Sequence, residues 1–177
     1  MKSDFIENVY EIKSEIFKDK RGSFMSCFKE NEKLFKKVWV DKKICQINLS
    51  ITNKKGTIRG LHYQEKPYQE AKLIRCLRGK VWDVVIDLRS HSNTYKKWFS
   101  VELCSSKNNA IFIPEGCAHG FQSLQDNCEL LYIHSNNYKP SYERGIKWDD
   151  PIINISWPLN LKEISDRDKS LPYFEEI

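Results

Sequence analysis

The feature that most constrains the fold is a run of short apolar segments between Val40 and about residue 136. Each segment has about ten residues or fewer, and the breaks between them include Arg78-Gly79 and Pro114-Glu115-Gly116. Many short strands at this spacing predict an all-β sandwich or barrel. The segments are KKICQINLSI, GTIRGLH, KLIRCLR, KVWDVVIDL, KWFSVELC, NAIFIP, HGFQSL and ELLYIH.

The segments on either side of this run are predicted to be peripheral. YEIKSEIFKDKRGSFMSCF predicts a strand, a turn around Asp19 to Gly22 and a second strand, and KENEKLFKKV is the best short helix candidate, amphipathic through Leu34, Phe35 and Val38. The tail is richer in Pro, Asn and Asp and predicts turns with one or two short helices. At 177 residues the chain has the length of one domain. We expect a core barrel over about residues 38–136, N-terminal strands within 1–37 and a C-terminal wrap over 137–177.

The formal net charge of +5 could indicate a nucleic-acid-binding protein, but the distribution of the charged residues along the chain argues against it. The lysines occur as scattered pairs with acidic residues between them, a pattern that indicates a solvated, mildly basic surface. No nucleic-acid partner is therefore expected. A few arginines in a cleft would still suit a small anionic substrate that carries a pyrophosphate.

The cysteines and the N-terminal residues indicate the compartment. Six cysteines are scattered without a CxxC pair, so no zinc ribbon or thioredoxin motif is present, and we expect small core residues in a reducing cytosol. The first residues, MKSDFIENVY, have no apolar run behind a basic start, and no stretch has the length of a membrane span. A soluble, cytoplasmic protein without a membrane partner is expected.

The densest group of chemically active side chains lies between Gly56 and Arg78, where two short strands carry Arg59, His62 and Lys72. Strict alternation would place Arg59 and Leu61 on one face of the first strand and His62 on the other. His62 is the best general-base candidate, because imidazole has the unperturbed pKa nearest neutrality. A histidine at a strand end is also a common hydrogen-bonded filler, so spacing alone leaves its role open.

Later strands add further candidates. In VWDVVIDL one face carries the apolar side chains of Trp82, Val84, Ile86 and Leu88, and we expect this face to be core. Asp83 and Asp87 lie on the other face. In ELLYIH the alternation allows Tyr132 to point into a barrel mouth. The string IPEGCAHGF predicts a strand corner that returns His119 toward the interior.

A metal site is a further hypothesis, because histidines on neighbouring strands of a small barrel are common ligands. Such a site usually needs three or four protein ligands. Gln64 stands two residues after His62, where a second histidine would be required, and His91 falls in a turn. Only His134 is left as a possible third ligand, so no metal ligands are predicted.

Taken together, the motifs resemble those of a known family. The strings RGSF, Gln46-x-Asn48-x-Ser50, GTIRGLHYQ, KLIRCLRGKVWDVVIDLR, IPEGCAHGFQSL, LLYIHSNNYKPSYERGIKWDDP, SWP and SDRD occur in the order and spacing of the dTDP-4-dehydrorhamnose 3,5-epimerase family. The resemblance covers nearly the whole chain.

The resemblance implies a cupin-type jelly-roll barrel, a double-stranded β-helix with short peripheral helices, that works without a metal or other cofactor. It also implies a homodimer in which strands and some substrate contacts are exchanged between subunits. The implied reaction is the epimerisation of C3 and C5 of a nucleotide-diphosphate sugar, dTDP-4-keto-6-deoxy-glucose, on the route to dTDP-L-rhamnose.

The resemblance also implies roles for matching positions. His62 would be the base, Asp168 the carboxylate that orients it, Tyr132 the acid on the opposite face of the sugar, and Lys72 a neighbour of the 4-keto oxygen. The implied substrate-binding residues are Arg21 and Arg59 near the diphosphate, Gln46, Asn48 and His119 elsewhere along the substrate, and Tyr138, Glu143 and Arg167 at the edge of the site.

The chemistry of such a reaction suits these residue types. A hydrogen next to a ketone can be removed because the electron pair flows into the carbonyl as an enolate, so a base is needed at carbon and a cation at oxygen. A carboxylate bound to the far imidazole nitrogen fixes the tautomer and stabilises the imidazolium. Inversion requires a second residue that returns the proton from the other side. Asp166 is an alternative to Asp168 as the orienting carboxylate, because it is only two residues away.

Two departures from the family pattern concern specificity. Ser26 stands where an acidic residue is common shortly after RGxF, and the apolar Ile47 and Leu49 flank Asn48. Alternatives are therefore an epimerase that acts on another 4-keto nucleotide sugar, or one that inverts a single carbon. Further alternatives are a metal-dependent cupin enzyme and a non-catalytic sugar-nucleotide binding protein.

Overall fold

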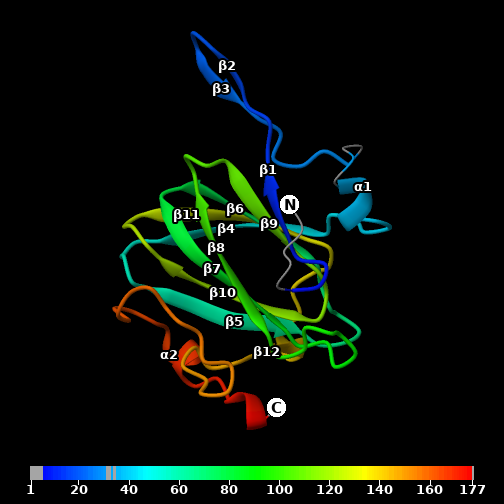
Figure 1. Ribbon diagram of the computed structural model, residues 1–177, viewed down its shortest axis with the longest axis vertical. Coiled ribbons are helices and arrows are strands. Elements are labelled where there is room, and N and C mark those ends of the chain that lie inside the picture. The colour runs from blue at the N-terminus through cyan, green and yellow to red at the C-terminus, as the bar shows by residue number, and fades with distance from the viewer. Residues whose placement is uncertain (1–5, 31–32, 34, 177) are drawn as a thin grey trace.

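The computed structural model describes residues 6–30, 33 and 35–176, and its main body consists of two antiparallel sheets that enclose a common core (Figure 1). The predicted all-β jelly-roll barrel with short peripheral helices is confirmed. The first sheet has the order β1 (Tyr10–Lys13), β9 (Asn109–Ile113), β6 (Lys72–Arg78), β11 (Cys128–His134) and β4 (Gln46–Thr52). The second has the order β12 (Glu143–Gly145), β5 (Ile58–Gln64), β10 (Cys117–Ser123), β7 (Lys80–Asp87) and β8 (Trp98–Cys104).

The eight segments predicted as strands after Val40 are strands β4 to β11. Two further strands extend the sheets, because β1 pairs with β9 and β12 pairs with β5. Both added strands lie outside the range 38–136 that was expected for the core barrel. The sheets therefore take in parts of the N-terminal segment and of the C-terminal wrap.

The interior of the barrel is filled by inward-facing side chains from both sheets. Ile74 and Leu130 of the first sheet pack against Val85 and Phe121 of the second, and each is at most 1% exposed. Close packing of such side chains excludes water and contributes roughly 1.5–3 kcal/mol for each fully buried residue. The polar end of this interior is where the site residues described below gather.

The outer face of the second sheet is also buried, which changes the interpretation of strand β7. Val84 and Ile86, on the face predicted to be core, pack with Ile146 and Ile153 of the C-terminal wrap. Asp83 lies on the opposite face, where it is fully buried. The predicted apolar face is thus buried, but beneath the wrap rather than inside the barrel.

The N-terminal segment covers part of the outer face of the first sheet. Helix α1 (Phe35–Val38) buries Phe35 and Val38, which pack with Trp39 and Phe112. The helix is shorter than predicted over residues 29–38, because Lys29 and Glu30 are not helical. Leu34, predicted for its apolar face, lies outside the described residues.

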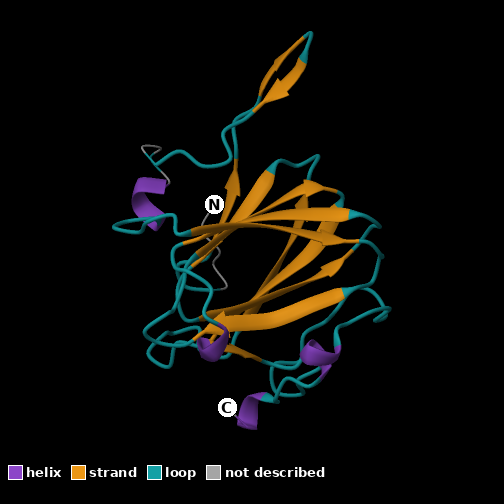
Figure 2. Ribbon diagram, turned by 180° about the vertical axis from the view of Figure 1, so that it is seen from behind, coloured by secondary structure: helices purple, strands orange, loops and turns teal. Residues whose placement is uncertain are grey.

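Strands β2 (Phe17–Asp19) and β3 (Gly22–Phe24) form a hairpin that projects away from the barrel (Figures 1 and 2). The predicted strand, turn and strand around Asp19 to Gly22 is confirmed. Phe17 is 60% exposed and Phe24 is 72% exposed. This hairpin, called the arm below, leaves two large apolar side chains without cover in the single chain.

Strand β5 contains a bulge that interrupts the expected alternation of its side chains. His62 pairs with His119 and Arg59 with Phe121 of β10, so three steps on β5 match two steps on β10. The extra residue reverses the pleat, as β-bulges do. Arg59 and His62 consequently both line the cleft, whereas Leu61 is buried against Ile146, and the expectation that Arg59 and Leu61 share a face is wrong.

Gly60 is required at this bulge because its φ is +116° and the neighbouring strand is close. A Cβ at Gly60 would lie 2.6 Å from Gly120 Cα and 2.8 Å from the His119 carbonyl oxygen. The two glycines therefore permit a close approach of β5 to β10 directly beside His62.

Gly60→Ala is expected to lower the free energy of unfolding by about 2 kcal/mol or more, because it combines an unfavourable φ with contacts to rigid backbone. Gly22→Ala in the arm is the matched control, since Gly22 has φ +136° and nothing within 4 Å of the added Cβ. Urea denaturation of both variants measures the difference. Equal destabilisation would contradict the proposed role of the close approach.

Candidate active site

A cleft of about 1160 Å³ lies between the two sheets and the C-terminal wrap. Strands β4, β5 and β11 supply most of its polar lining, together with residues from Glu163 to Asp168. Of the twelve predicted site residues, all except Arg21 line this cleft. His62 and Asp168, for example, are 106 positions apart in the sequence and form a hydrogen bond in this cleft.

The centre of the cleft holds a hydrogen-bonded pair of His62 and Asp168. The Nε2 atom of His62 lies 2.8 Å from Oδ1 of Asp168, and the other carboxylate oxygen accepts a hydrogen bond of 3.1 Å from the Gly60 amide. Asp168 is 5% exposed and belongs to the short helix α2 (Asp166–Lys169), capped by Ser165. Asp166 has a fully exposed side chain and pairs with Lys169, so Asp168 is the one that contacts the imidazole.

The hydrogen bonds keep Asp168 ionised. Burial alone raises the pKa of a carboxyl group, but the hydrogen bond and charge of His62, with the Gly60 amide, lower the pKa of Asp168 below its usual value. An ionised Asp168 accepts a hydrogen bond from Nε2–H of His62, so the ring proton stays on Nε2. The Nδ1 atom is then the basic nitrogen of the ring, available to a substrate in the cleft.

Lys72 is the buried cation of the site. It begins strand β6, is 7% exposed, and its Nζ lies 3.3 Å from the Glu70 carboxylate and 3.4 Å from the carbonyl oxygen of His62. Burial of an ammonium group is costly unless it is paired. Glu70 meets that requirement and holds the charge of Lys72 next to His62.

Tyr132 faces His62 from the other sheet, since it lies on β11 while His62 lies on β5. Its ring makes an edge contact with His119 at 5.9 Å and is stacked with His134 at 5.9 Å. Burial raises the pKa of Tyr132 well above its usual value, and the charge of Asp83 adds to this effect. The phenol therefore stays protonated at neutral pH and can donate a proton.

His119 forms a second buried imidazole–carboxylate pair, with Asp83 on β7. Its Nε2 lies 2.8 Å from Asp83 Oδ2, and both residues are at most 5% exposed. Burial raises the pKa of Asp83, and the charge of His119 opposes that rise. The Oδ1 atom of Asp83 has no hydrogen-bond partner within the described part of the chain.

Arg59 is held at the side of the cleft by strand β4. Its guanidinium donates to Thr52 Oγ1 at 3.1 Å and to the Ile51 carbonyl oxygen at 3.0 Å. Among the described residues no carboxylate forms an ion pair with it. A positive charge fixed in this way can bind an anionic group of a ligand.

The outer rim of the cleft, defined here as Tyr138, Glu143 and Arg167, is a small hydrogen-bonded cluster. The Tyr138 hydroxyl donates to Glu143 Oε2 at 2.6 Å, and Arg167 donates to the same oxygen. The Tyr138 ring is 44% exposed. The rim thus offers a flat aromatic surface beside the mouth.

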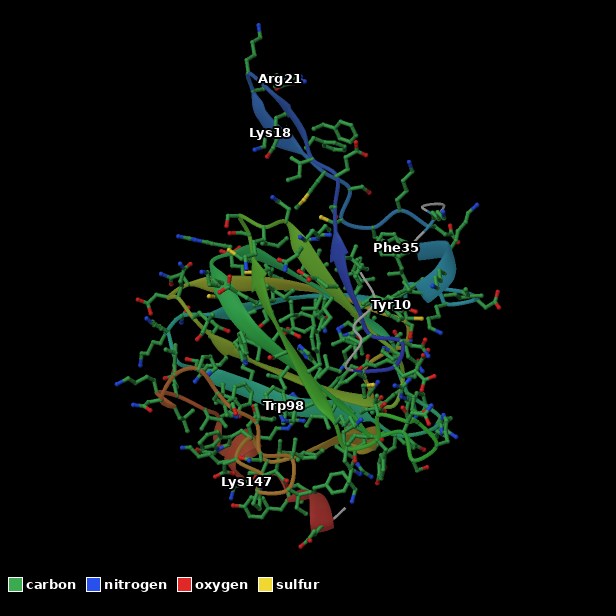
Figure 3. All side chains as sticks on the ribbon, viewed as in Figure 1. Tyr10, Lys18, Arg21, Phe35, Trp98 and Lys147 are labelled. Atoms are coloured by element: carbon green, nitrogen blue, oxygen red, sulfur yellow. The ribbon has the colours of Figure 1, made fainter. Side chains whose placement is uncertain are left out.

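Arg21 is the one predicted site residue that the chain does not bring to the cleft. It lies at the tip of the arm, where Figure 3 shows its side chain far from the barrel. Its side chain is 85% exposed and pairs with Asp19 at 2.6 Å. A role for Arg21 in the cleft of its own subunit is therefore not supported by this arrangement.

Three residues of the site were not assigned by sequence reasoning. Glu70 and Asp83 were not proposed as ligands or partners of other groups, and His134 was considered only as a metal ligand. Glu70 lies in the irregular segment before β6, and Asp83 in a strand whose apolar face dominates its pattern. Their partners, Lys72 and His119, were predicted, so the carboxylates could have been found by asking which acidic side chains pair with these two residues.

Two general features concern the rest of the chain. Within residues 6–30, 33 and 35–176, no group of three or more His, Cys, Asp or Glu side chains is arranged to hold a metal ion. None of the helices in the same ranges combines the length and the apolar character that crossing a bilayer demands.

Comparison with known proteins agrees with this geometry. The model of the family described as dTDP-4-dehydrorhamnose 3,5-epimerase matches residues 4–176. The enzyme of that name from Shigella flexneri is 43% identical over 92% of this chain and 89% of its own length. A Legionella pneumophila epimerase, solved in complex with dTDP-4-keto-L-rhamnose, superimposes with a TM-score of 0.91 at 32% identity, covering 97% of this chain and 90% of that one.

A further similar structure is ChmJ, a 3'-monoepimerase from Streptomyces bikiniensis, in complex with dTDP-quinovose. It has a TM-score of 0.86 and 32% identity, with coverage of 95% of this chain and 84% of that one. Fold, cleft and similarity define a carbohydrate epimerase of the jelly-roll class. The chain belongs to the dTDP-4-dehydrorhamnose 3,5-epimerase family.

The lowered pKa of Asp168 makes a prediction about stability. The ionised carboxylate stabilises the fold at pH values above the unfolded-state pKa, which is near 3.8. This stabilisation is lost as the pH falls through the lower folded-state pKa. Asp168→Asn should therefore lower the free energy of unfolding by about 1.5–3 kcal/mol at pH 7, with a shrinking difference below pH 3.8. Urea denaturation across this pH range measures it.

Asp166→Asn is the control for that experiment, since its side chain is fully exposed two residues away. It should change the stability little at either pH. A loss at Asp168→Asn that is the same at pH 7 and at about pH 2.5 would exclude the ionised pair as its cause.

Proposed function

We propose that the protein is an epimerase that inverts C3 and C5 of dTDP-4-keto-6-deoxy-glucose, giving dTDP-4-keto-L-rhamnose. The observation that carries this proposal is the opposition of His62 and Tyr132 across one cleft, with the Lys72 ammonium beside them. The names of the relatives support the substrate. The cleft supports it as well, because fixed positive charge and an aromatic rim suit a nucleoside diphosphate.

The first half of the reaction is proton removal. Nδ1 of His62 takes the hydrogen from the carbon next to the ketone as a proton, and the C–H electron pair moves into the carbonyl to form an enolate. Lys72 stabilises the negative charge that develops on the oxygen. Asp168, bound to Nε2, stabilises the imidazolium that forms.

The second half is return of a proton from the opposite side. The electron pair of the enolate takes the proton of the Tyr132 hydroxyl, and the carbonyl re-forms with the carbon inverted. The high pKa of Tyr132 keeps this proton in place until the enolate is present. Two carbons flank the ketone, so the same pair of residues can act on each in turn. His62 then releases its extra proton to solvent, and the Tyr132 phenolate takes a proton from solvent, which restores both residues.

We also propose a cytoplasmic homodimer in which the arm reaches the cleft of the partner subunit. Exposed Phe17 and Phe24 on the arm, and exposed Ile47, Leu49 and Ile51 on strand β4, supply apolar surface for such a contact. Arg21 at the tip would then bind the substrate diphosphate of the partner's site. The six cysteines are free thiols, as suits a reducing compartment.

Solvent exchange tests the reaction. The protein incubated with dTDP-4-keto-6-deoxy-glucose in heavy water should incorporate two deuterons, at C3 and C5, measured by mass spectrometry and NMR. One deuteron would identify an enzyme that inverts a single carbon, as the name 3'-monoepimerase says of ChmJ. No incorporation by folded protein would contradict the proposal.

His62→Ala and Tyr132→Phe should each reduce the exchange rate about 10²- to 10⁴-fold, because each removes one proton-transfer group. Neither should change the thermal melting curve greatly. Tyr95→Phe, a change of the same kind at a partly exposed turn position, should leave the rate unchanged. Near-native activity of either site variant would exclude the assigned roles.

The arm is tested separately. Arg21→Ala should raise KM at least about tenfold through the loss of a charge-assisted contact to the diphosphate. Lys20→Ala changes the neighbouring exposed cation of the same turn and should have little effect. Sedimentation should show a dimer. A monomer whose KM is insensitive to Arg21→Ala would contradict this part of the proposal.

A further inference from the structure

Glu70 and His134 form a buried pair that the reaction above does not use. Nδ1 of His134 lies 2.8 Å from Glu70 Oε2, and the side chains are 11% and 8% exposed. The second oxygen of Glu70 lies 3.3 Å from the Lys72 ammonium. A single carboxylate thus contacts an imidazole and the cation of the site at the same time.

A chain of hydrogen bonds leads from this pair to the outer rim. Asn48 Nδ2 lies 3.3 Å from Nε2 of His134, and Asn48 Oδ1 accepts from Gln46 Nε2 at 2.9 Å. Gln46 Oε1 in turn accepts from the backbone amide of Tyr138 at 2.9 Å. The chain therefore runs without interruption from a rim residue to the buried carboxylate.

The backbone amide at the rim sets the direction of every bond in the chain. An N–H group can only donate, so Gln46 must present its oxygen to Tyr138 and its NH₂ group to Asn48. Asn48 must then present its own NH₂ group to Nε2 of His134, which acts as the acceptor. A flipped amide at either position would bring two donors together. The proton of His134 therefore belongs on Nδ1, where it is donated to Glu70.

The charge at the other end agrees with this direction. Burial raises the pKa of Glu70, but the hydrogen bond from His134 and the nearby charge of Lys72 lower it below its usual value. An ionised Glu70 can accept from both neighbours. It supplies the negative charge that a buried ammonium requires.

We infer that Glu70 and His134 are positioning residues which hold the Lys72 ammonium at the reacting end of the cleft and the amides of Asn48 and Gln46 at its outer end. The effect of the pair on the reaction rests on the proposed function. His134 also stacks on Tyr132, with an angle of 11° between the rings, so the same imidazole supports the proton donor. One buried pair thus fixes the cation, the acid and the amides.

The tautomer of His134 is tested without any substrate. ¹⁵N NMR of the wild-type protein, with the His134 signals assigned by their loss in His134→Phe, should show protonation of Nδ1 and an unprotonated Nε2. Protonation of Nε2 alone would overturn the inference, because Nδ1 could then not donate to Glu70. This result is independent of whether the protein acts on the dTDP sugar.

The kinetic test compares variants at different points along the chain of hydrogen bonds, because kcat should be affected at the Glu70 end and KM at the Asn48 end. Glu70→Gln keeps the shape of the side chain but releases Lys72, so kcat should fall at least about tenfold with little change in KM. Asn48→Leu, at an exposed position of β4, should raise KM and leave kcat within about threefold. His134→Phe keeps the ring on Tyr132 but removes both nitrogens, and should change both parameters.

Coupling of the pair gives the last readout. The double variant Glu70→Gln/His134→Phe should lose less in kcat/KM than the product of the two single losses, because the two residues act through one contact. His91→Gln, at an exposed turn, is the matched control and should behave as the wild type. Two outcomes would overturn the inference. One is a loss in kcat/KM of the double variant that equals the product of the two single losses. The other is that every variant only lowers the amount of active enzyme and leaves KM unchanged. Asn48→Leu keeps the test valid if Glu70→Gln fails to fold.

Discussion

The Asp168 carboxylate is the interaction on which the rest of the site depends. One oxygen binds the His62 imidazole and the other binds the backbone amide of Gly60. The same contact therefore orients the base, anchors the bulge of β5 and attaches the C-terminal wrap to the barrel. A bulge without this acceptor would leave a buried amide unpaired, which costs about 1–3 kcal/mol. Local backbone geometry and catalytic geometry are thus satisfied by a single side chain.

The cleft has rigid walls because side chains are packed inside the barrel and also against the outer faces of its sheets. The C-terminal wrap covers the outer face of the second sheet, and helix α1 covers part of the outer face of the first. Polar side chains inside the barrel can then be held by fixed partners instead of water. His119 with Asp83 and His134 with Glu70 are two imidazole–carboxylate pairs of this kind. The imidazole rings of both pairs contact the ring of Tyr132, His119 edge-on and His134 stacked.

Much of this could be predicted from the sequence, and the failures have physical causes. Short strands with regular turns predicted the barrel, and the resemblance to a family named eleven residues that line the cleft. The prediction that Arg59 and Leu61 share a face failed because the bulge adds one residue to β5 and so changes the face on which the following side chains lie. Nothing in the sequence IRGLH indicates that one of its residues is unpaired. Asp83 was missed because a strand buried on both faces has no solvent side to mark its polar residues. The prediction for Arg21 differs from the other eleven, because its exposed side chain lies on the arm and does not line the cleft of this chain.

The wrap has a consequence for how such a protein would lose activity with age or heat. Residues 143–174, all of them described, bury one outer face and also deliver Asp168, yet their one strand in the sheets is the three-residue β12. A segment joined to the sheet by one short strand and a few further hydrogen bonds can open while the other strands of the barrel keep their hydrogen bonds. Each opening would remove the partner of His62 without exposing the interior. Inactivation would then be a reversible local event with its own rate, separate from aggregation of the unfolded barrel.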